Sequence, residues 1–264
     1  TLQLLPKIAP IFGGLTIPIL YFIVHELFKD RNIALISSAL LATATFHVYQ
    51  TSHAAPLTIG HFFMMICIYF FIKFSQKSRY LIPLLLSTAL LIMSHHFTMY
   101  FYLISITFML FSYAYCHPKQ WKQSWILLSY VLTASSAAFI YWIAIATPVY
   151  EGFMNGTLLV SSPYVIILYY ISTVTGFFVC VHSQKIKTML PSIKYKPMDI
   201  SITKKVGFSF VILLIASLIT MKTGIPGVYI KLTPLAILYS IPMILLASFS
   251  FAGFSLLKKQ KNDY

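Results

Sequence analysis

Residues 80–116 read YLIPLLLSTALLIMSHHFTMYFYLISITFMLFSYAYC, two long apolar runs separated by a pair of histidines. The runs at 80–94 and 97–116 contain no Lys, Arg, Asp or Glu. A helix needs about 20 mostly apolar residues to cross the hydrocarbon core of a bilayer. We therefore predict two membrane-spanning helices, joined by a polar turn that contains His95 and His96.

The composition of the whole chain agrees with a membrane protein. Of its 264 residues, 59% are hydrophobic and 9% are charged, and the mean hydropathy is +0.83. Soluble domains are roughly one quarter charged. The apolar runs are too long and too continuous for the alternating pattern of a membrane β-barrel. These features predict an all-α, polytopic bundle of transmembrane helices.

Nine apolar runs are candidate spans. Their boundaries are 8–28, 33–50, 58–72, 80–94, 97–116, 124–147, 162–182, 206–221 and 234–257. With this assignment, 16 of the 19 Lys and Arg residues fall in alternate connections and in the C-terminal tail. Basic residues collect on the cytoplasmic side of membrane proteins, so the N-terminus is predicted outside and the C-terminus inside. We expect one membrane domain over 1–257 and a cytoplasmic tail over 258–264, in a plasma membrane or its equivalent.

The net charge of +14 is explained by these orientation signals, so we expect membrane lipid and no nucleic acid as a partner. The three cysteines are predicted to be packing residues without a disulfide framework. They are Cys67, Cys116 and Cys180.

Five of the eight histidines fall on the predicted outer side, where basic residues are rare. They are His47, His53, His61, His95 and His96. One interpretation is that they are ordinary interfacial residues at helix ends. The other is a polar pocket for an anionic or hydroxyl-rich ligand, because imidazole can donate and accept hydrogen bonds. No HxxxH or HxH spacing supports a zinc site, and a divalent metal ion stays an open alternative.

Only one of the five acidic residues, Glu151, falls on the outer side. It is therefore the candidate catalytic acid of the chain, and the alternative is a solvated loop carboxylate. The same connection contains Asn155-Gly156-Thr157, a pattern for N-glycosylation. The chain has no phosphate-binding glycine-rich loop, nucleophile elbow or dinucleotide fingerprint.

Residues 7–63 resemble the second to fourth membrane helices of the GT-C superfamily. The stretch reads KIAPIFGGLTIPILYFIVHELFKDRNIALISSALLATATFHVYQTSHAAPLTIGHFF. The matching positions are Lys7, Pro10, Gly13-Gly14, Leu27-Phe28, Arg31, Tyr49, Ser52 and Ala55, with His53 where the family has Arg. SHHFTMYF, residues 94–101, is similar to archaeal members. The superfamily includes protein mannosyltransferases, aminoarabinose transferases and catalytic subunits of oligosaccharyltransferase.

The resemblance implies an integral-membrane glycosyltransferase. Such enzymes move a sugar from a polyprenyl-phosphate carrier, such as dolichyl phosphate, to a glycan, lipid or protein acceptor on the outer face. The residues expected to bind the donor phosphate are Lys7, Ser52, His53, His95, His96 and Lys231, with Glu151 as the catalytic residue.

The sequence also departs from the family pattern. Members carry a catalytic Asp or Glu in the first outer loop, before the region of resemblance, and many carry another acid where this chain has Leu57 and Thr58. The chain starts at Thr1 without an initiator Met. We therefore expect a fragment that lacks the first span and first outer loop, and that does not catalyse transfer alone.

Two other functions fit the same sequence. A transporter or flippase for a lipid-linked or anionic substrate could also use an outer histidine pocket, although no internal repeat or pair of broken helices favours it. A non-catalytic membrane subunit is the third alternative.

Cysteine labelling tests the predicted topology. In a chain whose native cysteines are replaced, Ala54→Cys and Phe153→Cys should react with an impermeant maleimide added outside intact cells. Tyr195→Cys should react only after permeabilisation, because segment 183–205 contains six lysines and is predicted to be cytoplasmic. Labelling of position 195 from outside would refute the topology.

Overall fold

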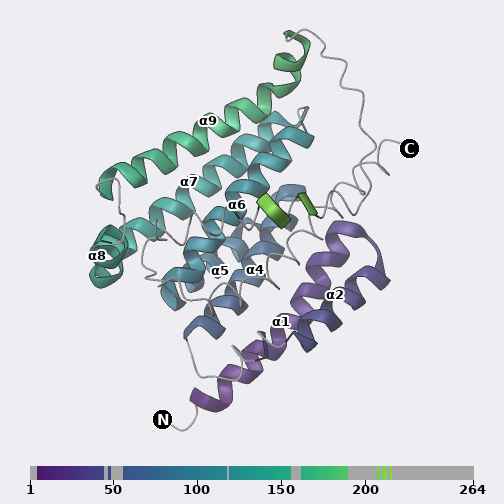
Figure 1. Ribbon diagram of the computed structural model, residues 1–264, viewed down its shortest axis with the longest axis vertical. Coiled ribbons are helices and arrows are strands. Elements are labelled where there is room, and N and C mark those ends of the chain that lie inside the picture. The colour runs from purple at the N-terminus through teal and green to yellow at the C-terminus, as the bar shows by residue number, and fades with distance from the viewer. Residues whose placement is uncertain are drawn as a thin grey trace. The chain divides into compact units, whose positions relative to one another are not determined.

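The computed structural model describes residues 5–44, 47–48, 56–117, 119–155 and 162–189, and isolated helical residues between 207 and 215 (Figure 1). These residues are almost all helical and include no strand, so the predicted all-α bundle is confirmed. The chain divides into two compact units. The first contains residues 1–149 and 168–189, and the second contains residues 150–167 and 190–264.

The chain reverses sharply between its first two helices, α1 (Leu5–Phe28) and α2 (Arg31–Thr43). Lys29 has a left-handed backbone (φ 55°), and its N–H donates to the carbonyl of His25, which closes the end of α1. The next residue, Asp30, caps α2 by accepting hydrogen bonds from the N–H groups of Asn32 (2.7 Å) and Ile33 (3.1 Å). The two-residue turn thus ends one helix and begins the next.

Further helical segments follow among the described residues. They are α4 (Pro56–Gln76), the 3₁₀ turn η1 (Ser78–Tyr80), α5 (Leu81–Ser94), α6 (His96–Cys116), α7 (Trp121–Ala144) and α9 (Ser162–Met189). Helix α8 (Thr147–Asn155) and helix α9 both include residues of the two units, because the division falls after Val149 and after Ile167. Helix α4 is the central helix, because it contacts α1 on one hand and α5 and α6 on the other, and so connects the α1–α2 pair to the rest of the bundle.

Aromatic contacts show the relative direction of α1 and α4. The rings of Phe12 and Phe62 lie 4.9 Å apart, and those of Phe22 and Tyr69 lie 6.3 Å apart. The residue numbers rise together along the two helices, so α1 and α4 run parallel.

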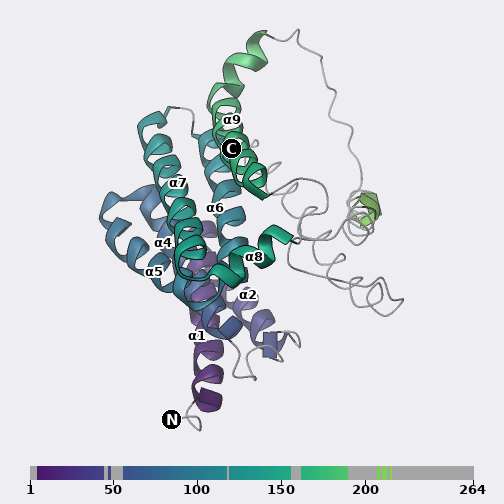
Figure 2. The same ribbon diagram turned by 90° about the vertical axis from the view of Figure 1, so that its left-hand side faces the viewer.

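Helices α6, α7 and α9 run side by side in both views (Figure 1; Figure 2). The hydroxyl of Tyr169 on α9 lies 3.1 Å from Thr107 Oγ1 of α6 and 2.9 Å from Ser135 Oγ of α7. Further along, Trp125 of α7 meets Phe177 of α9 with ring centroids 5.1 Å apart. Helix α9 is therefore antiparallel to α7.

Four of the described helices are long and apolar enough to cross a membrane: Ile8–Phe28, Pro56–Gln76, His96–Cys116 and Trp121–Ala144. Two shorter apolar helices, Ser78–Ser94 and Ile166–His182, coincide with the predicted spans 80–94 and 162–182. The last predicted span, 234–257, lies outside the described residues, as does most of 206–221.

The prediction of one continuous helix over 33–50 is wrong. Helix α2 ends at Thr43, and Ala44 has an extended backbone (ψ 112°). Thirteen residues rise about 20 Å, less than the roughly 30 Å of a hydrocarbon core. The sequence does not predict this helix end, because Thr43, Ala44 and Thr45 are not strong helix breakers.

The interior of the bundle contains a connected set of polar side chains. The hydroxyl of Tyr130 on α7 lies 2.6 Å from both Thr88 Oγ1 of α5 and the Tyr102 hydroxyl of α6. Thr88 also donates to the carbonyl of Leu84 at 2.7 Å and lies 3.8 Å from Cys67 Sγ of α4. Four helices are thus joined by hydrogen bonds where water is excluded.

Large apolar side chains are exposed on the outside of α2 and of the helices that follow it. The most exposed include Ile36, Leu40, Ile82, Leu86, Met93, Phe108 and Ile140. In water such a surface would be unfavourable, whereas lipid tails match it. The exposed surface therefore agrees with a bundle embedded in a bilayer.

Removing the central hydroxyl should destabilise the bundle. Tyr130→Phe leaves the hydroxyls of Thr88 and Tyr102 with one partner fewer in a buried place, which costs about 1–3 kcal/mol. Thermal unfolding in detergent should show a lower midpoint. The matched control is Tyr170→Phe, which removes a half-buried hydrogen bond between the Tyr170 hydroxyl and Ser136 Oγ (2.9 Å). This variant should lower the unfolding midpoint less. Equal effects would contradict a special role for the buried network.

Candidate functional site

The two ends of the bundle differ in their polar residues. At one end, connections rich in Lys and Arg follow α1, α4 and α6. At the other end lie His47, His61, His95 and His96, and a proton on His61 would be repelled by a proton on His47 or His95. We call this second end the histidine end.

His95 occupies the turn between α5 and α6 and caps α6. Its own backbone is extended (φ −160°), and its Nδ1 accepts a hydrogen bond from the Thr98 N–H at 3.2 Å. The Thr98 hydroxyl lies 2.7 Å from the same nitrogen. A side-chain acceptor at this position satisfies one of the free N–H groups of the first helical turn. The capping bond fixes the orientation of the imidazole.

Helix α4 approaches this turn closely at Gly60. A Cβ atom at position 60 would lie 2.7 Å from His95 Cβ and 2.7 Å from Thr98 Oγ1, nearer than atoms of these kinds can pack. The contact therefore requires glycine at this position of α4. It holds the capped turn against the central helix.

A cavity of about 370 Å³ lies beside the turn. It is lined by Pro56 of α4, by Ile92, Met93 and Ser94 of α5, by His95 and His96, by Tyr141 and Trp142 of α7, and by Ala146 and Val149. The rings of His95 and His96 lie 5.2 Å apart. We call this space the His95–His96 cavity; it has a polar rim at the turn and an apolar wall from α5 and α7.

The surroundings keep His95 neutral. Burial lowers the pKa of His95 to about 4, and the neighbouring charges of His96 and His61 act in the same direction. The Glu26 and Asp30 carboxylates are at the far end of α1 and do not offset this effect. Near neutral pH the ring is therefore an uncharged hydrogen-bonding group.

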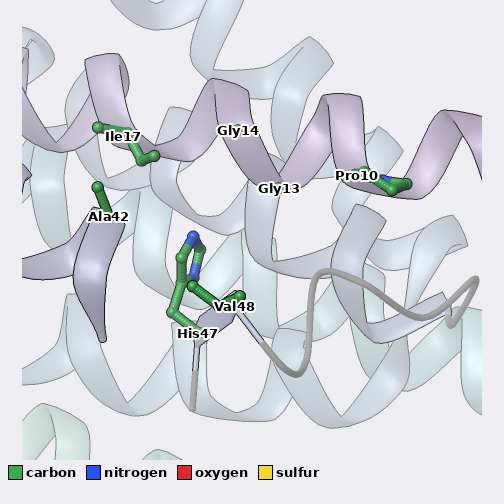
Figure 3. Close-up of a pocket in the computed structure, with 7 residues that line it drawn as sticks. All are labelled: Pro10, Gly13, Gly14, Ile17, Ala42, His47 and Val48. Atoms are coloured by element: carbon green, nitrogen blue, oxygen red, sulfur yellow. The ribbon is translucent and has the colours of Figure 1, made fainter. Parts of the chain in front are cut away.

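A second cavity, of about 280 Å³, lies where α1 and α2 meet (Figure 3). Its lining includes Gly13 and Gly14 of α1, and the His47 ring points toward this segment. His47 Nε2 lies 3.2 Å from Thr16 Oγ1. Burial lowers the pKa of His47, and a hydrogen bond with the Gly13 backbone opposes that shift. The imidazole of His47 is thus held against α1 by the Gly13 backbone and by Thr16.

The opposite end of the bundle is held by ion pairs. Glu26 of α1 contacts Lys29 and Lys73, each at 2.6 Å, and Lys73 belongs to α4. Nearby, Gln123 of α7 donates to the carbonyl of Phe74 at 3.0 Å. From the sequence, Glu26 was one of the four acidic residues predicted on the cytoplasmic side, and its contact with Lys73 of α4 was not predicted.

The structure brings together two of the predicted donor-binding residues, His95 and His96. Lys7 lies in α1, and Glu151 is exposed in α8. Ser52, His53 and Lys231 lie outside the described residues, so the expected grouping of His53 with the pair stays a prediction. Pro56, three residues after His53 in the sequence, lines the same cavity as the pair.

Several residues of the site were not anticipated. They are Gly60, Thr98, Tyr141 and Trp142. A glycine within an apolar run is a signal for close backbone approach, and Thr at the third position after His95 fits an N-terminal capping turn. Among the described residues, no three His, Cys, Asp or Glu side chains form a group that could hold a metal ion.

Comparison with known families identifies the class of protein. Residues 6–142 match the family model described as dolichyl-phosphate-mannose-protein mannosyltransferase. The chain belongs to this family of membrane glycosyltransferases, of the GT-C type, which use a polyprenyl-phosphate sugar, and the predicted resemblance is confirmed. No curated protein and no solved structure matches the chain. The match includes most of the lining of the His95–His96 cavity, from Pro56 to Trp142.

Substituting Gly60 should disturb the histidine turn. Gly60→Ala forces α4 and the turn apart, which should cost about 1–3 kcal/mol as an overpacked contact. Gly14→Ala is the matched control, since a Cβ there meets nothing within 4 Å and alanine favours a helix by about 0.5–1 kcal/mol. Thermal unfolding in detergent should therefore move in opposite directions for the two variants. A Gly60→Ala protein as stable as wild type would disprove the close contact.

Proposed function

We propose that this chain binds a polyprenyl-phosphate sugar at the histidine end and contributes to transfer of that sugar to a protein acceptor on the outer face of the membrane. The observation that supports this most directly is the His95–His96 cavity within the family-matched region. Its volume of about 370 Å³ is in the range of small-molecule sites, about 300–1,000 Å³.

The lining of the cavity suits both parts of such a donor. Imidazole N–H groups of His95 and His96 can donate to phosphate or sugar oxygens. Ile92, Met93 and Trp142 provide an apolar wall that fits an isoprenoid segment. A ligand with a polar head and a hydrocarbon chain would therefore meet matching chemistry on both sides.

The reaction needs a base and stabilisation of the leaving group. The bond between the anomeric carbon and the phosphate oxygen breaks, and its electron pair stays with the phosphate. The acceptor oxygen forms the new bond to that carbon and gives its proton to a base. Hydrogen-bond donors at the phosphate stabilise the charge that develops there. His95 and His96 fit this second role, and Glu151, an exposed carboxylate in α8, is the candidate base.

Lys7, Ser52, His53 and Lys231 complete the proposed set of donor-binding residues. The support for them is positional. Lys7 and Ser52 match the family pattern, His53 replaces the family's Arg, and Lys231 is one of the few basic residues on the predicted outer side. The proposed location is a plasma membrane or its equivalent, with the histidine end facing outward.

Loss of the histidine pair should weaken donor binding. The probe is dolichyl-phosphate-mannose, titrated against the full 264-residue chain in lipid nanodiscs. The double variant His95→Ser, His96→Ala should bind at least about tenfold more weakly, since a hydrogen bond to a charged group contributes about 1.5–3 kcal/mol. Serine at position 95 can still cap α6, which keeps the fold intact.

The control is His182→Ala, which removes an exposed histidine of α9 far along the helix from the cavity. This variant should bind as wild type does. Competition separates the two parts of the ligand, because dolichyl phosphate should displace the donor and dolichol should compete more weakly. Unchanged binding by the double variant would exclude the histidine pair from the site. Binding of other anions but not the dolichyl donor would favour the transporter function.

A further inference from the structure

The tautomer of His95 follows from its capping role. A backbone N–H can only donate, so the 3.2 Å contact from the Thr98 N–H requires His95 Nδ1 to be an acceptor. An accepting ring nitrogen bears no proton. The proton of the neutral imidazole must then be on Nε2.

The groups around the ring oppose a second proton. A proton on Nδ1 would face the Thr98 N–H and break the cap of α6. The neighbouring titratable groups are His96 on α6, His61 on α4 and Tyr141 on α7, and none of them is an acid that could stabilise an imidazolium. Burial acts in the same direction, and the pKa of His95 falls to about 4.

The rest of the ring is available to a ligand. His95 lines the His95–His96 cavity, and within the described residues its Nε2 has no hydrogen-bond partner. The close approach of Gly60 to His95 Cβ and Thr98 packs the turn against α4. The position of the imidazole is thus set by the helix cap and by α4 before any ligand arrives.

We propose that His95 binds the donor as a neutral group, donating one hydrogen bond from Nε2 to a phosphate or sugar oxygen, and does not act as a cation. This inference rests on the proposed function. His95 thus orients the donor through one directional hydrogen bond. Other groups neutralise the charge of the phosphate. The contribution of His95 to donor binding should therefore be constant from pH 8 to pH 5.

Nitrogen NMR tests the proposal directly. The full chain is labelled with ¹⁵N-histidine in nanodiscs, and the ring signals of His95 are assigned by their loss in His95→Ser. The ligand-free protein should show a protonated Nε2 and an unprotonated Nδ1, unchanged from pH 8 to pH 5. Thr98→Val removes the hydroxyl but keeps the N–H, so the tautomer should persist in this variant. A proton on Nδ1, or a doubly protonated ring at pH 6, would overturn the inference.

Addition of dolichyl-phosphate-mannose tests the ligand contact. The Nε2 signal of His95 should shift while the ring stays neutral, and the signals of His182 should not move. Donor binding without any response at His95 Nε2 would refute the contact but leave the proposed function standing. Absence of donor binding would refute the proposed function and with it the ligand contact, whereas the tautomer is decided by the ligand-free spectrum.

Discussion

Helix α4 touches the α5–α6 turn at Gly60, and the arrangement of the histidine end depends on this approach. His95 Cβ and Thr98 Oγ1 lie only 2.7 Å from where a Cβ of residue 60 would be. Any residue larger than glycine would therefore separate the helix from the turn. His95 of this turn caps α6, and His95 and His96 line the His95–His96 cavity. One backbone contact thereby connects helix packing, helix capping and the shape of the cavity.

Polar groups serve different purposes in the middle of the bundle and at its histidine end. Thr88, Tyr102 and Tyr130 satisfy one another within 2.6 Å and cross-link the helices where lipid offers no hydrogen bonds. At the histidine end, the polar side chains line a cavity. Buried polar groups that pair internally stabilise a membrane bundle, and those that face a cavity are the ones available to a ligand.

The sequence predicted the helical class and most of the long helices, because uninterrupted apolar runs allow little else in a membrane. It also predicted a polar turn at His95 and His96. It did not reveal the end of α2 at Thr43, since Ala44 breaks the helix through its backbone alone. The contact of Gly60 with His95 and the pairing of Glu26 with Lys73 were also hidden, because residues 35 and 47 positions apart meet only once the helices pack.

The two ends of α4 are secured by forces of different kinds, and this gives them different responses to the surrounding solution. The contact at Gly60 is steric and indifferent to dissolved ions. The other end depends on Glu26, whose partner Lys73 keeps 20% of its side chain exposed, whereas Lys29 keeps 62%. Exposed pairs are screened by salt more than sheltered ones. Rising ionic strength should therefore weaken the Glu26–Lys29 pair first and then the Glu26–Lys73 pair that joins α1 to α4, and should leave the contact at Gly60 unchanged.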